Sequence, residues 1–230
     1  TNRSKEMIGI PYLNPHIPRT IFFRNDIKFN FFKKTINYIS KVFSLNKDYN
    51  FLSGTNFKYI ILSHLVSYDH LKYYNDFYFG NLAEKLGHKD VLFILIDHIG
   101  FDKKKIKEKI NGNYIILSKS SGLLDEFKMF FMTFIKSFYH QLFNSKLKIF
   151  NLTNIMRSIE NQRISLKVKK ILKDIKCNNF LFTFEGNPYE KLVCKEVKSI
   201  DTKINRVGYQ FTVLRKYQHS IYQNINKNYE

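Results

Sequence analysis

The chain has 230 residues and is strongly basic, with 38 Lys and Arg against 19 Asp and Glu and a formal net charge of +19. Its length is enough for one large or two small domains with a buried core. Its two cysteines are too few for a disulfide framework or a zinc cluster and fit a reducing cytosol, and no apolar run reaches the roughly eighteen residues of a spanning helix.

The positive charge has two explanations. An excess of Lys and Arg commonly indicates nucleic acid, an anionic membrane surface or a phosphorylated substrate as partner. The chain is also rich in Lys, Asn, Ile, Phe and Tyr, which is the composition expected when an AT-rich genome biases codon use. Both explanations stay open, and attraction to acidic lipids or nucleotide phosphates follows from either.

The amino-terminal part of the sequence predicts an arm and then a helix. Residues 1–24 hold three of the four prolines and show little periodicity, which predicts an extended arm. Over 26–43, apolar residues spaced three and four apart predict an amphipathic helix with lysines on its other faces. Such a helix suits the outside of an α/β domain, with a membrane-surface element as the alternative.

Strands and helices alternate along the rest of the chain. Apolar runs predict buried strands over 59–65, 91–96, 114–117 and 180–184, with a further strand beginning at 207–210. Helices are predicted over 81–86, 103–110, 124–143, 154–175 and 189–197. The alternation predicts an α/β fold, with a Rossmann-like parallel sheet and helices on both faces.

The predicted helix 124–143 carries six apolar residues on one broad face. A face of this kind is normally covered in a globular protein. We therefore expect this helix to be buried against a sheet or a neighbouring domain.

Polar residues follow four of the predicted strands: Ser63-His64, Asp97-His98, Ser118 to Ser121, and Glu185. A parallel sheet brings these strand ends to one edge, where ligand clefts form. Glu185 and Asp97 are the carboxylate candidates for catalysis, and His98 and His64 are the candidates for proton transfer or hydrogen bonding. The structural alternatives are that Glu185 caps the following helix, that Asp97-His98 is a strand-end turn, and that His64 is bonded to backbone.

Further candidates for substrate binding surround these strand ends. They are His64, Ser118, Ser120, Gly186, Asn187, Tyr189, Glu190, Tyr209 and Gln210. Glu190 is expected to support Glu185, or to pair with Lys191 or Arg206. Tyr189 is expected to pack in the core or to stack on a sugar ring.

The stretch from 180 to 210 resembles a family of bacterial surface and capsular polysaccharide glycosyltransferases with two Rossmann-like domains, the GT-B arrangement. The family pattern is a hydrophobic strand, Tyr/Phe-Glu-Gly-x-x-Tyr/Trp-Glu, a helix, and later Gly-Tyr-Gln-His. The matching residues are Phe184, Glu185, Gly186, Tyr189, Glu190, Gly208, Tyr209 and Gln210. The chain departs from the pattern at Phe211, where the family has His, although a Gln-His pair follows at Gln218-His219.

The resemblance implies a domain layout and a reaction. Residues 25–215 would form the acceptor-side domain, 216–230 would begin an interdomain linker, and the second domain would be missing from this chain. A hexosyl or Kdo-type sugar would pass from a nucleotide-sugar donor to a surface glycan acceptor, without a bound cofactor or metal. We expect this part to be inactive alone and cytoplasmic, with peripheral association at the inner face of an anionic membrane left open.

Other function classes find less support in the sequence. It contains no GxGxxG, GxxxxGK[ST] or GxSxG motif and no His/Cys spacing for a structural metal. The second hypothesis is a non-catalytic basic domain that docks on anionic membrane, polymer or nucleic acid. Basic and aromatic residues at 215–217 suit nucleic acid, but no recognition motif accompanies them, so no nucleic acid is expected as partner.

Overall fold

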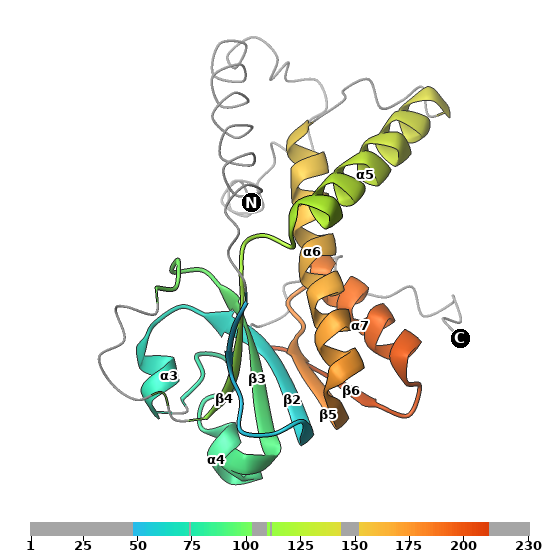
Figure 1. Cartoon of the computed structure of the whole chain (residues 1–230). Coiled ribbons are helices and arrows are strands. Elements are labelled where there is room, and N and C mark those ends of the chain that lie inside the picture. The colour runs from blue at the N-terminus through green and yellow to red at the C-terminus, as the bar shows by residue number, and fades with distance from the viewer. Residues whose placement is uncertain (1–47, 74, 103–109, 111, 144–151, 212–230) are drawn as a thin grey trace, which may run out of the picture. The chain divides into compact units, whose positions relative to one another are not determined.

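A computed structural model describes residues 48–73, 75–102, 110, 112–143 and 152–211 (Figure 1). The predicted arm 1–24, the predicted helix 26–43, nearly all of the predicted helix 103–110 and the segment 216–230 lie outside these residues.

The described residues form one six-stranded sheet in the order β1-β4-β3-β2-β5-β6. The strands are β1 (Tyr49–Phe51), β2 (Asn56–Leu65), β3 (Val91–Asp97), β4 (Asn113–Leu117), β5 (Lys176–Thr183) and β6 (Asn205–Tyr209). The edge strand β1 runs antiparallel to β4, whereas every other neighbouring pair is parallel. The predicted α/β class is therefore confirmed.

The parallel strands have the order of a doubly wound fold. Counted along the chain, they lie as third, second, first, fourth and fifth across the sheet. In this order, which is that of Rossmann-type folds, the connections leave in opposite directions from the two central strands. Those strands are β2 and β5, which pair through Ile60↔Phe180 and Leu62↔Phe182. Ligands of such sheets bind beyond the carboxyl ends of the strands at this switch point.

Helices lie on both faces of the sheet (Figure 1). They are α3 (Asp69–Tyr73), α4 (Leu82–Leu86), α5 (Leu123–Phe143), α6 (Leu152–Asp174) and α7 (Pro188–Ile200), with a short 3-10 helix η2 (His88–Asp90). Side chains alternate along β2, so Ile60 and Leu62 pack with α6 and α7, whereas Ile61 and Leu65 pack with α3 and α4. By the same alternation, His64 faces α7 and Ser63 faces the opposite side.

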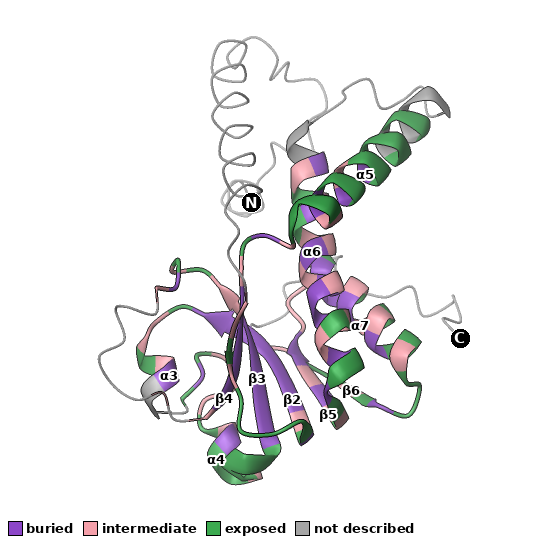
Figure 2. Ribbon diagram, viewed as in Figure 1, coloured by how far each residue is buried: buried purple, intermediate pink, exposed green. Residues whose placement is uncertain are grey.

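The broad apolar face of α5 is exposed, whereas the sequence predicted that it would be buried (Figure 2). The structure buries its Glu126, Met129 and Thr133 side, whereas Phe127 on the broad apolar face is 71% exposed. The reason is polar pairing, because Glu126 and Thr133 bond to side chains of α6 and turn the opposite face outward. Among the described helices, none is both long and apolar enough to cross a bilayer.

Candidate functional site

The polar strand ends lie at one edge of the sheet, as predicted. Leu65 at the end of β2 is in register with Asp97 at the end of β3, and Ile96 is in register with Leu117 at the end of β4. Because these strands are parallel to β5, the turn after Thr183 lies at the same edge. The first part of the site is at the switch point between β2 and β5, and the second lies beyond β3 and β4.

A chain of hydrogen bonds joins Tyr189, His64 and His98 at the switch point. His64 Nε2 lies 2.8 Å from the Tyr189 hydroxyl, and His64 Nδ1 lies 2.7 Å from His98 Nε2. Thr183 Oγ1 lies 3.3 Å from the same hydroxyl. His64 and Tyr189 are buried and His98 is exposed. His64 is thus bonded to side chains rather than to backbone, and it connects a buried phenol to an exposed imidazole.

The buried members of this chain are neutral near pH 7. Burial, and to a lesser degree the neighbouring His98, lowers the pKa of His64 from 6.5 to about 4. Burial also raises the pKa of the Tyr189 phenol. A neutral imidazole donates at one ring nitrogen and accepts at the other. The direction of the Tyr189 bond therefore determines whether His64 donates to His98 or accepts from it.

The acidic turn after β5 is organised by Glu190. Its carboxylate accepts hydrogen bonds from the backbone nitrogens of Glu185 at 3.0 Å, Gly186 at 2.9 Å and Asn187 at 3.0 Å. Gly186 has a φ of 86°, which side-chain-bearing residues rarely adopt. Burial raises the pKa of Glu190, and these hydrogen bonds oppose the rise. Glu190 thus fixes the turn and the start of α7 from a fully buried position.

Asn187, and not Glu185, is the N-cap residue of α7, and it forms a capping box with Glu190. One carboxylate oxygen of Glu185 accepts a hydrogen bond from the backbone nitrogen of Phe211 at 2.6 Å. Burial raises the pKa of the Tyr78 phenol, and the nearby carboxylates of Glu185 and Asp76 raise it further. The Tyr78 ring lies 5.2 Å from the His64 ring. Tyr78 therefore lies close to both the Glu185 carboxylate and the His64 imidazole.

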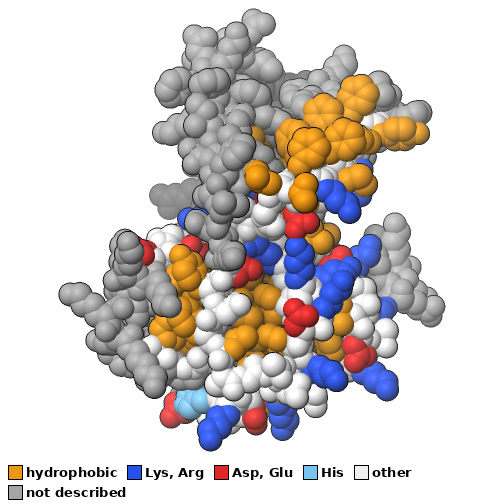
Figure 3. All heavy atoms as spheres, viewed as in Figure 1, with side chains coloured by type: hydrophobic (Ala, Val, Ile, Leu, Met, Phe, Trp, Pro, Cys, Tyr) orange, Lys and Arg blue, Asp and Glu red, His pale blue; other side chains and the backbone are white. Residues whose placement is uncertain are grey.

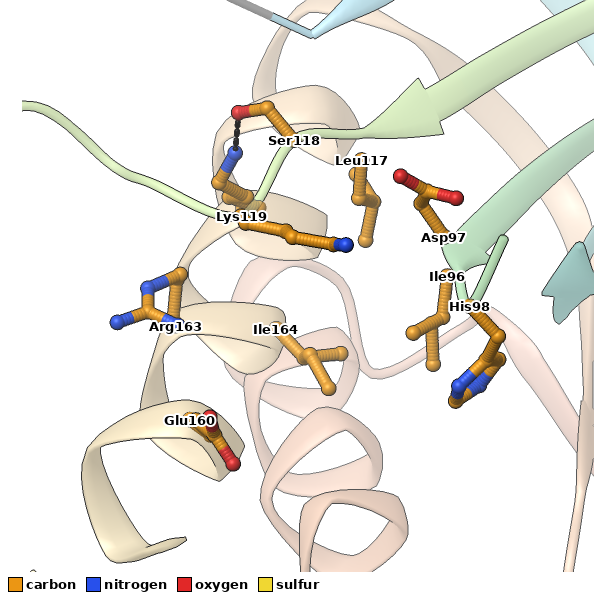
Figure 4. A pocket seen from close by; sticks show the side chains of 10 residues that line it. Ile96, Asp97, His98, Leu117, Ser118, Lys119, Glu160, Arg163 and Ile164 are labelled. Carbon is orange, nitrogen blue, oxygen red and sulfur yellow. Dashed lines mark hydrogen bonds between the residues drawn. The ribbon is translucent and has the colours of Figure 1, made fainter. Parts of the chain in front are cut away.

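The second part of the site is a pocket of about 330 Å³ beyond β3 and β4, closed on one side by α6 (Figure 4). Its lining consists of Ile96, Asp97, His98, Leu117, Ser118, Lys119, Glu160, Arg163, Ile164 and Lys167. Figure 4 shows Lys119 extending across the pocket in the direction of Ile96 and Asp97. His98 belongs both to this pocket and to the histidine chain.

Two cations in the pocket wall are held in pairs. Arg163 binds Glu126 through two bonds, at 2.5 and 2.8 Å, and both side chains are buried. Lys167 Nζ donates to Asp48 and to Ser118 Oγ, both at 2.6 Å. Burial lowers the pKa of Lys167, and Asp48 opposes this shift. Lys119 is exposed, and the described residues offer it no ion pair.

Asp97 is used to form the loop that follows β3. One of its oxygens accepts from the backbone nitrogens of Ile99 at 3.1 Å and Gly100 at 2.9 Å. The other accepts from Phe101 N at 2.9 Å. Since removing a proton from substrate would compete with these bonds, the geometry favours the strand-end turn over the catalytic interpretation of Asp97.

The remaining predicted residues divide into buried and accessible groups. Ser120 and Tyr189 are buried, so neither presents its side chain to a ligand, and Tyr189 cannot stack on a sugar. Ser120 Oγ instead accepts from Gly122 N. Tyr209 is exposed at the end of β6, and its carbonyl accepts from Phe184 N at 2.7 Å. This bond brings Tyr209, and with it Gln210, next to the acidic turn.

Sequence reasoning missed several residues of this edge. Asp76 accepts from Ser63 Oγ at 2.8 Å, and burial raises its pKa. It lies in an irregular, aromatic-rich segment that gave no motif. Arg163 and Lys167 are four residues apart, so the sequence places them on the same face of the predicted helix 154–175. This spacing could have indicated that both contribute to one wall of a site.

Within the described ranges, no group of three or more His, Cys, Asp or Glu side chains is placed to hold a metal ion. Comparison of the chain with protein-family models, curated proteins and solved structures found no match.

Proposed function

We propose that the chain is the acceptor-side domain of a two-domain glycosyltransferase, which moves a sugar from a nucleotide-sugar donor to a surface glycan. The observation that carries the proposal is that Tyr78 lies beside both Glu185 and His64, so that the carboxylate and the Tyr189–His64–His98 chain occupy the same switch point of the sheet. The resemblance of the acidic turn to that enzyme family supplies the reaction class.

In this proposal Glu185 is the general base. The acceptor hydroxyl gives its proton to the carboxylate while its oxygen bonds to the anomeric carbon of the donor, and the bond from that carbon to the nucleotide phosphate breaks. The bond from Phe211 N holds one oxygen of the Glu185 carboxylate in place before substrate arrives. A positioned base contributes roughly 10²–10⁴-fold to such a step.

The pocket beyond β3 and β4 is the proposed acceptor subsite. Ile96, Leu117 and Ile164 offer an apolar wall for the carbon–hydrogen face of a sugar ring. Its polar groups carry both signs of charge, which suits several hydroxyls better than one strong anion. Its volume of about 330 Å³ is at the lower end of the range for small-molecule pockets, about 300–1,000 Å³.

The test uses the full-length protein with a panel of nucleotide sugars and a glycan acceptor. We expect one donor to raise the melting temperature and to be turned over. Glu185→Gln should lower turnover by about 10²–10⁴-fold with the melting temperature unchanged. Glu196→Gln is the matched control, because Glu196 is a partly exposed carboxylate on α7 that pairs with Lys169.

Two results would contradict the proposal. One is full turnover by Glu185→Gln, which would remove this carboxylate from the mechanism. The other is the absence of stabilisation and turnover with every donor, which would favour a non-catalytic domain.

A further inference from the structure

The outward face of α5 is the largest exposed apolar feature of the described residues (Figure 3). Leu124 is 88% exposed, Phe127 71%, Phe131 53% and Phe138 52%. Met132 and Ile135 on the same face are also exposed. Contiguous patches of this kind usually mark an interaction surface.

This face is not needed to attach α5 to the domain. The opposite side of the helix packs on α6 through the buried Glu126–Arg163 pair and through Gln162, which donates to Thr133 at 3.0 Å. The Phe127 and Phe131 rings stack on each other along the helix, with centroids 6.4 Å apart. The outward face is therefore held in a fixed orientation while it stays exposed.

Charges on α5 exclude a spanning role and suit an interfacial one. Asp125, Glu126, Lys128 and Lys136 lie along its length. Lys128 and Lys136 are exposed, and Figure 3 shows further Lys and Arg side chains next to the apolar patch, over α6. Helices that lie in the plane of a membrane combine a large apolar face with nearby cations that bind anionic headgroups.

We propose that α5 docks this protein on an anionic membrane surface, with its outward face inserted at the level of the lipid headgroups. The alternative occupant is a second copy of the chain. The net charge of +19 opposes that pairing, because two such chains repel each other, whereas the same charge attracts an anionic bilayer. The inference does not depend on the proposed transfer reaction.

A single tryptophan can report insertion, because the chain contains none. We expect Phe131→Trp in the full chain to show a blue-shifted emission with vesicles of equimolar phosphatidylcholine and phosphatidylglycerol. Phosphatidylcholine vesicles alone should leave the emission unchanged. Phe211→Trp is the control, since Phe211 is exposed, packs beside Phe77 and Tyr78 and is not part of α5, so it should show no shift. Equal shifts at both positions, or no shift at Phe131→Trp, would overturn the proposal.

A binding measurement separates the membrane from a second copy. We expect the triple variant Phe127→Gln, Phe131→Gln, Phe138→Gln to lose vesicle co-sedimentation by about tenfold or more, with helix content and melting temperature retained. The control is Phe77→Gln with Phe211→Gln, which alters exposed aromatics away from α5. Unchanged co-sedimentation of the triple variant would overturn the proposal. So would a change from dimer to monomer in sedimentation without loss of vesicle binding, because it would identify a second copy as the occupant.

Discussion

The two halves of the sheet edge solve the problem of buried polar groups differently. At the switch point, buried Tyr189, His64 and Thr183 are neutral and share hydrogen bonds. Beyond β4, the buried side chains of Arg163 and Lys167 are paired with carboxylates. A neutral hydrogen-bonded chain buries no charge, whereas a buried ion pair is stable only while its two charges stay together. The first half can therefore reverse the direction of its hydrogen bonds while it stays neutral, and the second forms a rigid wall.

The largest expected effect comes from breaking the buried pair in the wall. Arg163→Met leaves Glu126 buried without its guanidinium partner, so we expect the free energy of unfolding to fall by about 3–5 kcal/mol. Denaturant titration measures the change. The double variant Glu126→Met with Arg163→Met should recover most of it, since no uncompensated charge remains. A double variant as unstable as the single one would mean that packing, not charge, dominates here.

The next effect is a pH dependence on the switch-point side. Because His64 has a folded pKa of about 4 against a usual 6.5, the unfolded chain binds this proton first as the pH falls. The stability that neutral His64 contributes is complete above pH 6.5 and declines by about 3 kcal/mol between pH 6.5 and pH 4. His64→Gln should remove this component of the pH profile of unfolding. If the unmodified protein and His64→Gln showed the same pH dependence of unfolding, the prediction that His64 is neutral in the folded state would be wrong.

A smaller effect is expected at the acidic turn. Glu190→Ala deprives three backbone N–H groups of their acceptor, so we expect a loss of about 2 kcal/mol in unfolding free energy. Glu196→Ala on the same helix should cost under about 1 kcal/mol, because its pair with Lys169 is partly exposed to solvent and holds no backbone group. Chemical denaturation of both variants tests the difference. Equal losses would show that the turn holds its shape without Glu190.

The smallest effect is expected for the exposed ion pair between Lys170 and Asp125, which joins α6 to α5 as the buried Arg163–Glu126 pair does. Lys170 and Asp125 have side chains that are 61% and 39% exposed. We expect Lys170→Ala to change the unfolding free energy by no more than about 0.5 kcal/mol. A loss close to that of Arg163→Met would show that burial does not distinguish the two pairs.

The sequence predicted most of the sheet because its strands are apolar runs bounded by Gly, Pro and polar residues. The predicted strand 91–96 differs from β3 by one residue, and the helix after Pro188 was found through its turn chemistry. The three-residue edge strand β1 was missed, since so short a segment carries no periodicity. Because the strands were predicted to be parallel, the polar residues at their carboxyl ends were expected at one edge of the sheet.

The partners at that edge could not be predicted, because they are distant in sequence. His64 and Tyr189 are 125 residues apart, and Glu126 and Arg163 are 37 apart. Periodicity likewise identified the apolar face of α5 but not its direction. That direction depends on polar contacts with α6, which no local pattern encodes.

The bond between Phe211 N and Glu185 makes one backbone amide a reporter for the acidic turn. Any ligand that draws this carboxylate oxygen away must release the amide to solvent. Hydrogen exchange at Phe211 would then accelerate on binding, while exchange within β5 would stay slow. Occupancy of the turn could thus be followed at a single peptide group, without knowledge of the ligand and without any turnover.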